Sequence, residues 1–213
     1  MAEKKLKLTP EEQITVRSYD RSAAEWASKH SAGRFWGYEM DRFNVLIPPG
    51  SQILEIGSGG GRDAKELVEM GYKYVGVDVS EGLLNEARRL NPGVTFLRRA
   101  VYDLGFHANQ FDGFWTSATL LHIPKKRLDA ALSEIFRVVK PSGIGFISIK
   151  KGKGEKIEDN DPEMAKKPRL FSYYSDEEFQ TILKRNGFEV LHATQKPMSE
   201  RTTWLIYFVR VKK

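Results

Sequence analysis

The sequence predicts an α/β fold with a doubly wound, mostly parallel sheet of seven strands, helices on both faces and an antiparallel C-terminal edge strand. Three observations predict it. Short apolar segments alternate with amphipathic helical segments between residues 53 and 149. A glycine cluster, "GSGGG" at 57–61, separates the first apolar segment from the next helix. The last two apolar segments, 188–194 and 202–211, are joined by a short connection, as antiparallel neighbours are.

Two helices are expected before the alternating region. The segment Thr9-Pro10-Glu11-Glu12 has a hydroxyl at the N-cap, proline at N1 and a carboxylate at N3. This is a capping box, and it predicts a helix that runs into the twenties. A second helix is indicated by apolar residues that share one face: Trp36, Met40, Phe43 and Ile47. Trp36 is expected in the core, and Pro48-Pro49-Gly50 ends this helix.

Five strands and three helices are expected in the middle of the chain. The strands are predicted at 53–56, 74–77, 94–97, 111–116 and 144–149. One helix follows Gly61, another is capped by Ser80, and the third covers 128–138 and ends at the turn 141–143. The polar stretch 150–168 is expected to be a mobile loop. Ser175 then begins a helix that ends at Gly187.

The composition narrows the possible functions of the protein but does not identify one. The 213 residues carry a formal net charge of +6 and contain no cysteine. Disulfides, thiolate catalysis and cysteine-based metal sites are therefore excluded, and no metal site is expected. No apolar run is long enough to span a membrane, and the charged N-terminus does not resemble a signal peptide, so we expect a soluble cytoplasmic protein. The basic residues are interspersed with acidic ones, which favours a solvated surface and leaves nucleic acid an open but less favoured partner.

The glycine cluster predicts a ligand-binding turn. Glycines let a ligand approach the backbone, and the following helix offers free N–H groups. Asp78, at the end of the second strand, is placed to accept hydrogen bonds from ribose hydroxyls. The third glycine of a dinucleotide fingerprint is replaced by Arg62, and Glu55 would repel a pyrophosphate but suits a cationic group. No Gly-Lys-Ser/Thr follows the cluster, so a P-loop is excluded.

Four segments of the chain resemble the motifs of one family. They are "LEIGSGGGRD", "VGVDVS", "FDGFWTSATLLHIP" and "EIFRVVKPSGIGFISI", and they are similar to those of the class I S-adenosylmethionine-dependent methyltransferases. The resemblance covers about residues 50–150 closely. It implies a Rossmann-like fold, S-adenosylmethionine as cofactor and S-adenosylhomocysteine as product. It also implies a single domain over 1–213, with a helical lid (1–49), a cofactor-binding core (50–150) and a substrate-side part (151–213).

The resemblance also implies which residues bind the cofactor. The glycines would cradle the methionine part with Glu55 near its ammonium, Asp78 would hold the ribose, and Val79 would pack on the adenine. The expected cofactor-binding residues are Glu55, Gly57, Ser58, Gly59, Gly61, Asp78, Val79, Ser80, Val101, Tyr102 and Thr116. One position departs from the family. Ala100 stands where an acid often contacts adenine, so that contact is lost or shifts to Asp103 or to backbone.

The acceptor side is less specified by sequence. His122, just past the fourth strand, is the candidate catalytic residue, either as a base or orienting group or, alternatively, as a structural contact before Pro124. His30, His107 and His192 are expected to be structural or on the surface. The expected acceptor-binding residues are Tyr19, Arg34, Arg169 and Tyr173. The leading hypothesis is methyl transfer to an O, N or S atom of a small molecule by a monomer or homodimer. The alternatives are an RNA or protein methyltransferase and a non-catalytic protein that binds S-adenosylmethionine.

Overall fold

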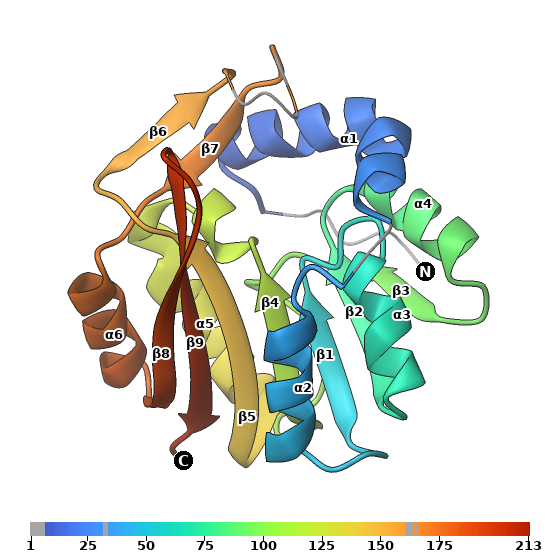
Figure 1. Ribbon diagram of the computed structural model, residues 1–213, viewed down its shortest axis with the longest axis vertical. Helices are drawn as coiled ribbons and strands as arrows, with labels where there is room; N and C mark the ends of the chain where they lie inside the picture. The colour runs from blue at the N-terminus through green and yellow to red at the C-terminus, as the bar shows by residue number, and fades with distance from the viewer. Residues whose placement is uncertain (1–6, 32–33, 161–163, 165) are drawn as a thin grey trace.

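The computed structural model describes residues 7–31, 34–160, 164 and 166–213 (Figure 1). Residues 1–6 and 32–33 of the expected lid, and 161–163 and 165 of the expected substrate-side part, lie outside the described residues. The strands are β1 (Gln52–Ile56), β2 (Lys73–Asp78), β3 (Thr95–Arg98), β4 (Phe111–Ser117), β5 (Val139–Lys150), β6 (Glu155–Glu158), β7 (Arg169–Ser172), β8 (Phe188–Ser199) and β9 (Thr202–Val211). The α-helices are α1 (Pro10–His30), α2 (Gly37–Leu46), α3 (Arg62–Glu69), α4 (Glu81–Leu90), α5 (Leu128–Val138) and α6 (Asp176–Arg185), and short 3₁₀ helices cover Leu120–His122 and Lys125–Arg127.

The predicted sheet is confirmed. Over the described residues, one sheet has seven strands in the order β3-β2-β1-β4-β5-β9-β8. The first five strands in this order are parallel, and β9 pairs antiparallel with both β5 and β8. The winding reverses between β1 and β4, so the carboxyl ends of these strands frame the place where open α/β sheets bind ligands.

The sheet separates two apolar cores, because alternate side chains of each strand point to opposite faces. Along β9, Leu205 and Tyr207 belong to one core, while Ile206 and Phe208 belong to the other. Helices α5 and α6 cover the first face, and α2, α3 and α4 cover the second. The expectation of helices on both faces is therefore confirmed.

The two N-terminal helices have different positions. Helix α1 begins with the predicted capping box, in which Thr9 Oγ1 accepts from the Glu12 N–H and the Glu12 side chain accepts from the Thr9 N–H. It lies across the strand ends, with β7 and α4 beside it (Figure 1). Helix α2 packs on the sheet through Phe43 and Met40, and Trp36 before it is buried as predicted. Of these two helices, only α1 covers the carboxyl ends of the strands.

The segment between β5 and α6 differs most from expectation. The stretch expected to be a loop contains β6, which pairs antiparallel with β7 as a two-stranded sheet beside α1 (Figure 1). The expected turn at 141–143 is an irregularity within β5, where Ser142 has a φ of 61° and the register with β4 shifts. Within the described residues, no helix combines the length and apolar character that a membrane span needs.

Candidate active site

Two adjoining cavities lie over the carboxyl ends of β1, β2 and β4. The larger, of about 180 Å³, is lined by α1, the glycine loop, the end of β2 and the segment after β4. The smaller, of about 90 Å³, extends toward residues 99–102 after β3. Residues that line both cavities include Thr15, Val16, Gly57, Asp78, Val79, Thr119 and His122. The site is therefore an elongated space beneath α1.

The glycine loop needs its bare backbone. Gly57 has a φ of +74°, and a Cβ placed on it would lie 1.9 Å from Thr119 Oγ1. A Cβ on Gly60 would lie 3.0 Å from the Cβ of Ala27 on α1. Gly59 has a φ of +54°, and a Cβ there would meet open space. A side chain at Gly57 would thus collide with Thr119, one at Gly60 would press closely against α1, and one at Gly59 would extend into the site.

Asp78 is the acid at the end of β2, and it also holds the loops around it. Its two carboxylate oxygens accept hydrogen bonds from the N–H groups of Gly59 (2.9 Å) and Ser80 (2.8 Å). Burial raises the pKa of Asp78, and the backbone N–H groups of Ser80 and Gly59 oppose this rise. Each carboxylate oxygen has a second lone pair, which leaves acceptor capacity for ligand hydroxyls.

Glu55 is a buried acid at the floor of the larger cavity. Burial and the nearby Asp63 carboxylate raise the pKa of Glu55 well above its ordinary value. The Tyr74 hydroxyl donates a hydrogen bond to the Glu55 carboxylate, which partly opposes this rise. A bound cation beside Glu55 would favour its ionised form.

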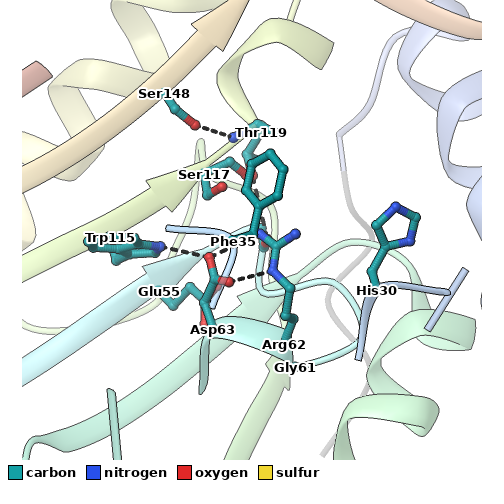
Figure 2. A network of polar contacts seen from close by, with 12 residues as sticks. His30, Phe35, Glu55, Gly61, Arg62, Asp63, Trp115, Ser117, Thr119 and Ser148 are labelled. Carbon is teal, nitrogen blue, oxygen red and sulfur yellow. Dashed lines mark hydrogen bonds and ion pairs between the residues drawn. The ribbon is translucent and has the colours of Figure 1, made fainter. Parts of the chain in front are cut away.

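The positively charged side chain of Arg62 lines the same cavity. Its Nε donates to Asp63 Oδ1 (2.6 Å), and the Trp115 Nε1–H donates to Asp63 Oδ2 (2.9 Å). Figure 2 shows this chain of contacts, with the Phe35 ring 5.2 Å from the guanidinium and His30 on the side of Arg62 away from Asp63. Trp115 is fully buried, so the sheet core fixes the position of Asp63 and through it of Arg62.

The smaller cavity is mostly apolar. Val79, Ala100 and Val101 line it, together with Tyr102. The Tyr102 hydroxyl donates to Glu12 of α1, and Arg127 donates to the other oxygen of Glu12. The Glu12 carboxylate therefore ties α1 to the walls of this cavity. It also places an acid from α1 in a cavity where Ala100 offers no polar group.

His122 contacts two different segments beside the larger cavity. Its Nε2 lies 2.9 Å from the Tyr19 hydroxyl, and its Nδ1 lies 2.6 Å from the Leu170 carbonyl oxygen. Arg169 Nη1 donates to the same Tyr19 hydroxyl at 2.9 Å. Tyr19 and His122 both line the cavity, whereas Arg169 is 2% exposed and lies behind Tyr19.

Most residues expected at the site do line it. Those that line one or both cavities are Glu55, Gly57, Ser58, Gly59, Asp78, Val79, Ser80, Val101, Tyr102, Tyr19 and His122. Gly61 does not; it precedes α3 with a φ of +78°, and a Cβ there would lie 2.5 Å from Asn91 Nδ2, so its role is in packing. Thr116 is fully buried, and Ser117, Ala118 and Thr119 line the cavity after it.

Of the four residues expected to bind the acceptor, Tyr19 lines a cavity, Arg169 lies behind Tyr19, and the other two lie elsewhere. Arg34 is exposed and pairs with Glu66 and Asp41 on the outer surface. The Tyr173 hydroxyl donates to Glu158 Oε1 (2.8 Å) on the β6–β7 sheet. Neither is among the residues that line the cavities.

Sequence reasoning missed most of the contribution of α1. The helix residues that line the cavities are Glu12, Thr15, Val16, Tyr19, Trp26, Ala27 and His30. Thr15, Tyr19, Trp26 and His30 follow spacings of four, seven and four, so they share one face of the helix. His30 stacks on Trp26, with ring centroids 3.8 Å apart, rather than lying apart from the site. This helical spacing from Tyr19, which was expected at the site, was the signal that could have identified Thr15 and His30.

Two hydroxyl groups indicate that the larger cavity is built for a polar ligand. Ser58 Oγ and Ser117 Oγ are buried, and within the described residues neither has a hydrogen-bond partner. Both residues line the cavity. Buried polar groups are normally hydrogen-bonded, so these two suit a ligand that carries donors and acceptors, such as an amino acid moiety. Together with Glu55 and Arg62, they fit the ammonium and carboxylate of S-adenosylmethionine.

Comparisons with known proteins agree with this geometry. A family model described as a methyltransferase domain matches residues 53–143. A demethylmenaquinone methyltransferase of Symbiobacterium thermophilum is 36% identical over 150 residues, which cover 62% of this chain and 57% of that protein. An uncharacterized methyltransferase of Synechocystis is 34% identical over 107 residues, 50% of each chain. The chain thus spans about half the length of the curated relatives it matches.

A solved structure extends the likeness to nearly the whole chain. The 1,6-didemethyltoxoflavin-N1-methyltransferase of Burkholderia thailandensis, with S-adenosylhomocysteine bound, has a TM-score of 0.76 and 18% identity. The alignment covers 98% of this chain and 93% of that one. At this identity the likeness concerns the fold. The fold, the matched domain and the glycine loop agree: residues 53–143 match a methyltransferase domain, and the chain has the fold of the S-adenosylmethionine-dependent methyltransferases.

Proposed function

We propose that this protein transfers the methyl group of S-adenosylmethionine to an O, N or S atom of a small-molecule acceptor. The observation that carries the proposal is the pair of adjoining cavities under α1. The larger cavity is lined by the glycine loop and Asp78 and also by Tyr19 and His122. A space covered by a helix suits a small acceptor that is shielded from water beside its cofactor.

The cofactor supplies the reactive methyl group, and the chain's residues bind and orient it. Glu55 and Arg62 offer opposite charges to the ammonium and carboxylate, and Ser58 and Ser117 offer hydroxyl groups. Asp78 accepts hydrogen bonds from the ribose hydroxyls. In the smaller cavity, Val79, Ala100 and Val101 would offer apolar contacts to the adenine ring, with Tyr102 beside them. Glu12 is the acid from α1 that is available to the adenine amino group in place of a residue at Ala100.

The acceptor end is aromatic. Tyr19 and Trp26 meet edge to face with centroids 5.5 Å apart, and His30 stacks on Trp26. All three line the larger cavity, as does His122. Aromatic walls with a few polar atoms favour a flat or apolar acceptor that carries one group for hydrogen bonding.

Calorimetry with S-adenosylhomocysteine tests the cofactor half of the proposal. Asp78→Asn keeps one oxygen for the backbone N–H groups but removes charge and acceptor capacity, so we expect affinity to fall about 10- to 100-fold from a micromolar value. The control is Asp41→Asn, which changes an exposed acid on α2. Equal affinities of wild type and Asp78→Asn would refute the ribose assignment.

A panel of small acceptors tests the catalytic half, with release of S-adenosylhomocysteine as the readout. Phenols, thiols, amines and heteroaromatic nitrogens cover the proposed atoms. Turnover with RNA or protein substrates, with steep salt dependence of RNA binding, would instead favour the macromolecular alternative, which has only the +6 charge in its support. Tight cofactor binding with no turnover on any class of acceptor would favour a non-catalytic binding protein. The oligomeric state, monomer or homodimer, stays a prediction.

A further inference from the structure

The hydrogen bonds around Tyr19 have defined directions. A carbonyl oxygen only accepts, so the Leu170 carbonyl, 2.6 Å from His122 Nδ1, requires the imidazole proton on Nδ1. In the neutral ring, Nε2 is then the acceptor, and the Tyr19 hydroxyl 2.9 Å away must donate to it. Arg169 has only donors, so its Nη1 donates to the Tyr19 oxygen at 2.9 Å. The order is Arg169 to Tyr19 to His122 to Leu170.

Both ring nitrogens of His122 are therefore engaged by the protein. The imidazole cannot take a proton directly from an acceptor unless one of these two bonds breaks. The Tyr19 hydroxyl differs, because an oxygen that passes its own proton to Nε2 regains a lone pair and can receive another proton in its place. Tyr19 also lines the larger cavity, next to Trp26.

We propose that Tyr19 is the catalytic residue that receives the acceptor proton, and that His122 and Arg169 are positioning residues that act through it. This inference rests on the proposed function. It assigns the hydrogen-bonding contact of the acceptor to the Tyr19 oxygen rather than to the imidazole.

Packing around Tyr19 keeps the three groups in line. The Arg169 guanidinium lies 5.4 Å from the Tyr19 ring centroid and 5.0 Å from that of Phe171. The Phe171 ring lies 5.0 Å from the His122 ring. The buried guanidinium beside the phenol oxygen favours negative charge on that oxygen as its proton leaves. The other ionisable residues that line the larger cavity are Glu55, Arg62, Asp63, Asp78 and His30.

The proposed methyl transfer moves one proton from the acceptor through Tyr19 to His122. As the bond between the acceptor atom and the methyl carbon forms and the carbon–sulfur bond breaks, the acceptor proton passes to the Tyr19 oxygen. The Tyr19 proton passes to His122 Nε2, which leaves a neutral tyrosine and an imidazolium. The imidazolium then releases one proton to solvent. An acceptor that carries an O–H, N–H or S–H group fits this sequence.

Nitrogen NMR of the histidine side chains in the full chain tests the hydrogen-bond directions without an acceptor. At a pH where His122 is neutral, we expect the Nδ1–H tautomer, which is the reverse of the usual preference of free histidine. In Tyr19→Phe the Nε2 resonance should shift, because its donor is lost, while the exposed control Tyr38→Phe should leave it unchanged. An Nε2–H tautomer in the wild type would overturn the proposal.

Kinetics with an acceptor from the panel test the role of Tyr19. Tyr19→Phe should lower kcat about 100-fold or more, the range for a lost proton-transfer group, with S-adenosylhomocysteine affinity retained. His122→Asn keeps a donor for Leu170 but removes the Nε2 acceptor, and it should lower kcat similarly. The double variant should be no slower than the slower single variant, because both changes interrupt one relay.

The outcomes separate the two proposals. Full turnover in Tyr19→Phe with loss in His122→Asn would make His122 the direct base and refute the relay alone. No turnover by the wild type with any acceptor would refute the proposed function, and the relay with it. Arg169→Lys, which keeps the charge, should retain more activity than Arg169→Met; equal loss in both would show that Arg169 does not act through its charge.

Discussion

The glycine loop offers a quantitative test of how the site is built. Replacing Gly57 with alanine adds a side chain at a φ of +74°, and its Cβ would lie 1.9 Å from Thr119 Oγ1 and 2.6 Å from Thr119 Cβ. The left-handed backbone costs about 1–2 kcal/mol for an L-residue. Overpacking adds about 1–3 kcal/mol. We therefore expect Gly57→Ala to lower the free energy of unfolding by about 2–5 kcal/mol.

Two other glycines separate these contributions. Gly50 has a φ of +86°, lies away from the site, and a Cβ on it would meet nothing within 4 Å. Gly50→Ala should therefore cost only the backbone part, about 1–2 kcal/mol. Gly59→Ala, at a φ of +54° with open space around its Cβ, should cost a similar amount but also weaken S-adenosylhomocysteine binding, because Gly59 lines the larger cavity.

Urea unfolding monitored by tryptophan fluorescence gives the free energies, and calorimetry gives the affinities. Both Gly57→Ala and Gly50→Ala carry the same type of backbone strain. The difference between their free energies of unfolding therefore measures the steric contribution of Thr119. If Gly57→Ala were no more destabilising than Gly50→Ala, Thr119 would not confine the loop, and the steric explanation of Gly57 would be wrong.

Four further predictions concern Glu55, Glu12 and the two residues, Arg34 and Tyr173, that lie outside the cavities. Burial raises the pKa of Glu55, and the ammonium of the bound cofactor should favour the ionised carboxylate, so cofactor binding should release a proton from Glu55. The affinity for the cofactor should therefore rise with pH. Calorimetry in two buffers with different ionisation enthalpies should detect this proton release in the wild type and not in Glu55→Gln. In the protein without cofactor, the raised pKa of Glu55 means that the free energy of unfolding falls as pH rises through the folded-state pKa. Urea titrations at several pH values should show a smaller decline in Glu55→Gln than in the wild type. Glu12→Gln should lower the free energy of unfolding by about 1–3 kcal/mol and weaken cofactor binding, because its bonds to Tyr102 and Arg127 tie α1 to the smaller cavity; unchanged affinity would contradict this. Arg34→Ala and Tyr173→Phe should leave turnover and cofactor affinity unchanged, and a loss in either would show that the acceptor extends beyond the described cavities.

The part of the candidate site around the glycine loop was predictable because its determinants are local in the chain. A buried strand, a glycine cluster and a helix start are adjacent between residues 52 and 69, and Asp78 ends the next strand. Parallel neighbours bring such strand ends to one edge of the sheet, so Asp78 and Gly59 meet without further information. Thr116 shows the limit of this logic. Strand β4 ends at Ser117, one residue later than expected, and the residues that line the cavity are Ser117, Ala118 and Thr119, which follow Thr116.

The acceptor half could not be predicted in this way. Strand β6 reads "EKIE", in which Glu155, Lys156 and Ile157 are exposed, so no buried apolar alternation distinguishes it from a loop. Pairing of β6 with β7 supports Arg169 and Leu170 beside α1. Arg34, which looked equally suited from composition, is instead drawn to the surface by Glu66 of α3.

The sequence by itself determined the winding of the sheet, the bare backbone of the glycine loop and the acid that follows β2, since each depends on neighbours in the chain. Only the tertiary structure decided which polar groups meet beside the larger cavity. Tyr19 lies 103 residues from His122 and 150 from Arg169, and their hydrogen bonds exist because α1 and β7 pack over the same strand ends. Contacts between segments so far apart are set by packing, which no local pattern of residues encodes.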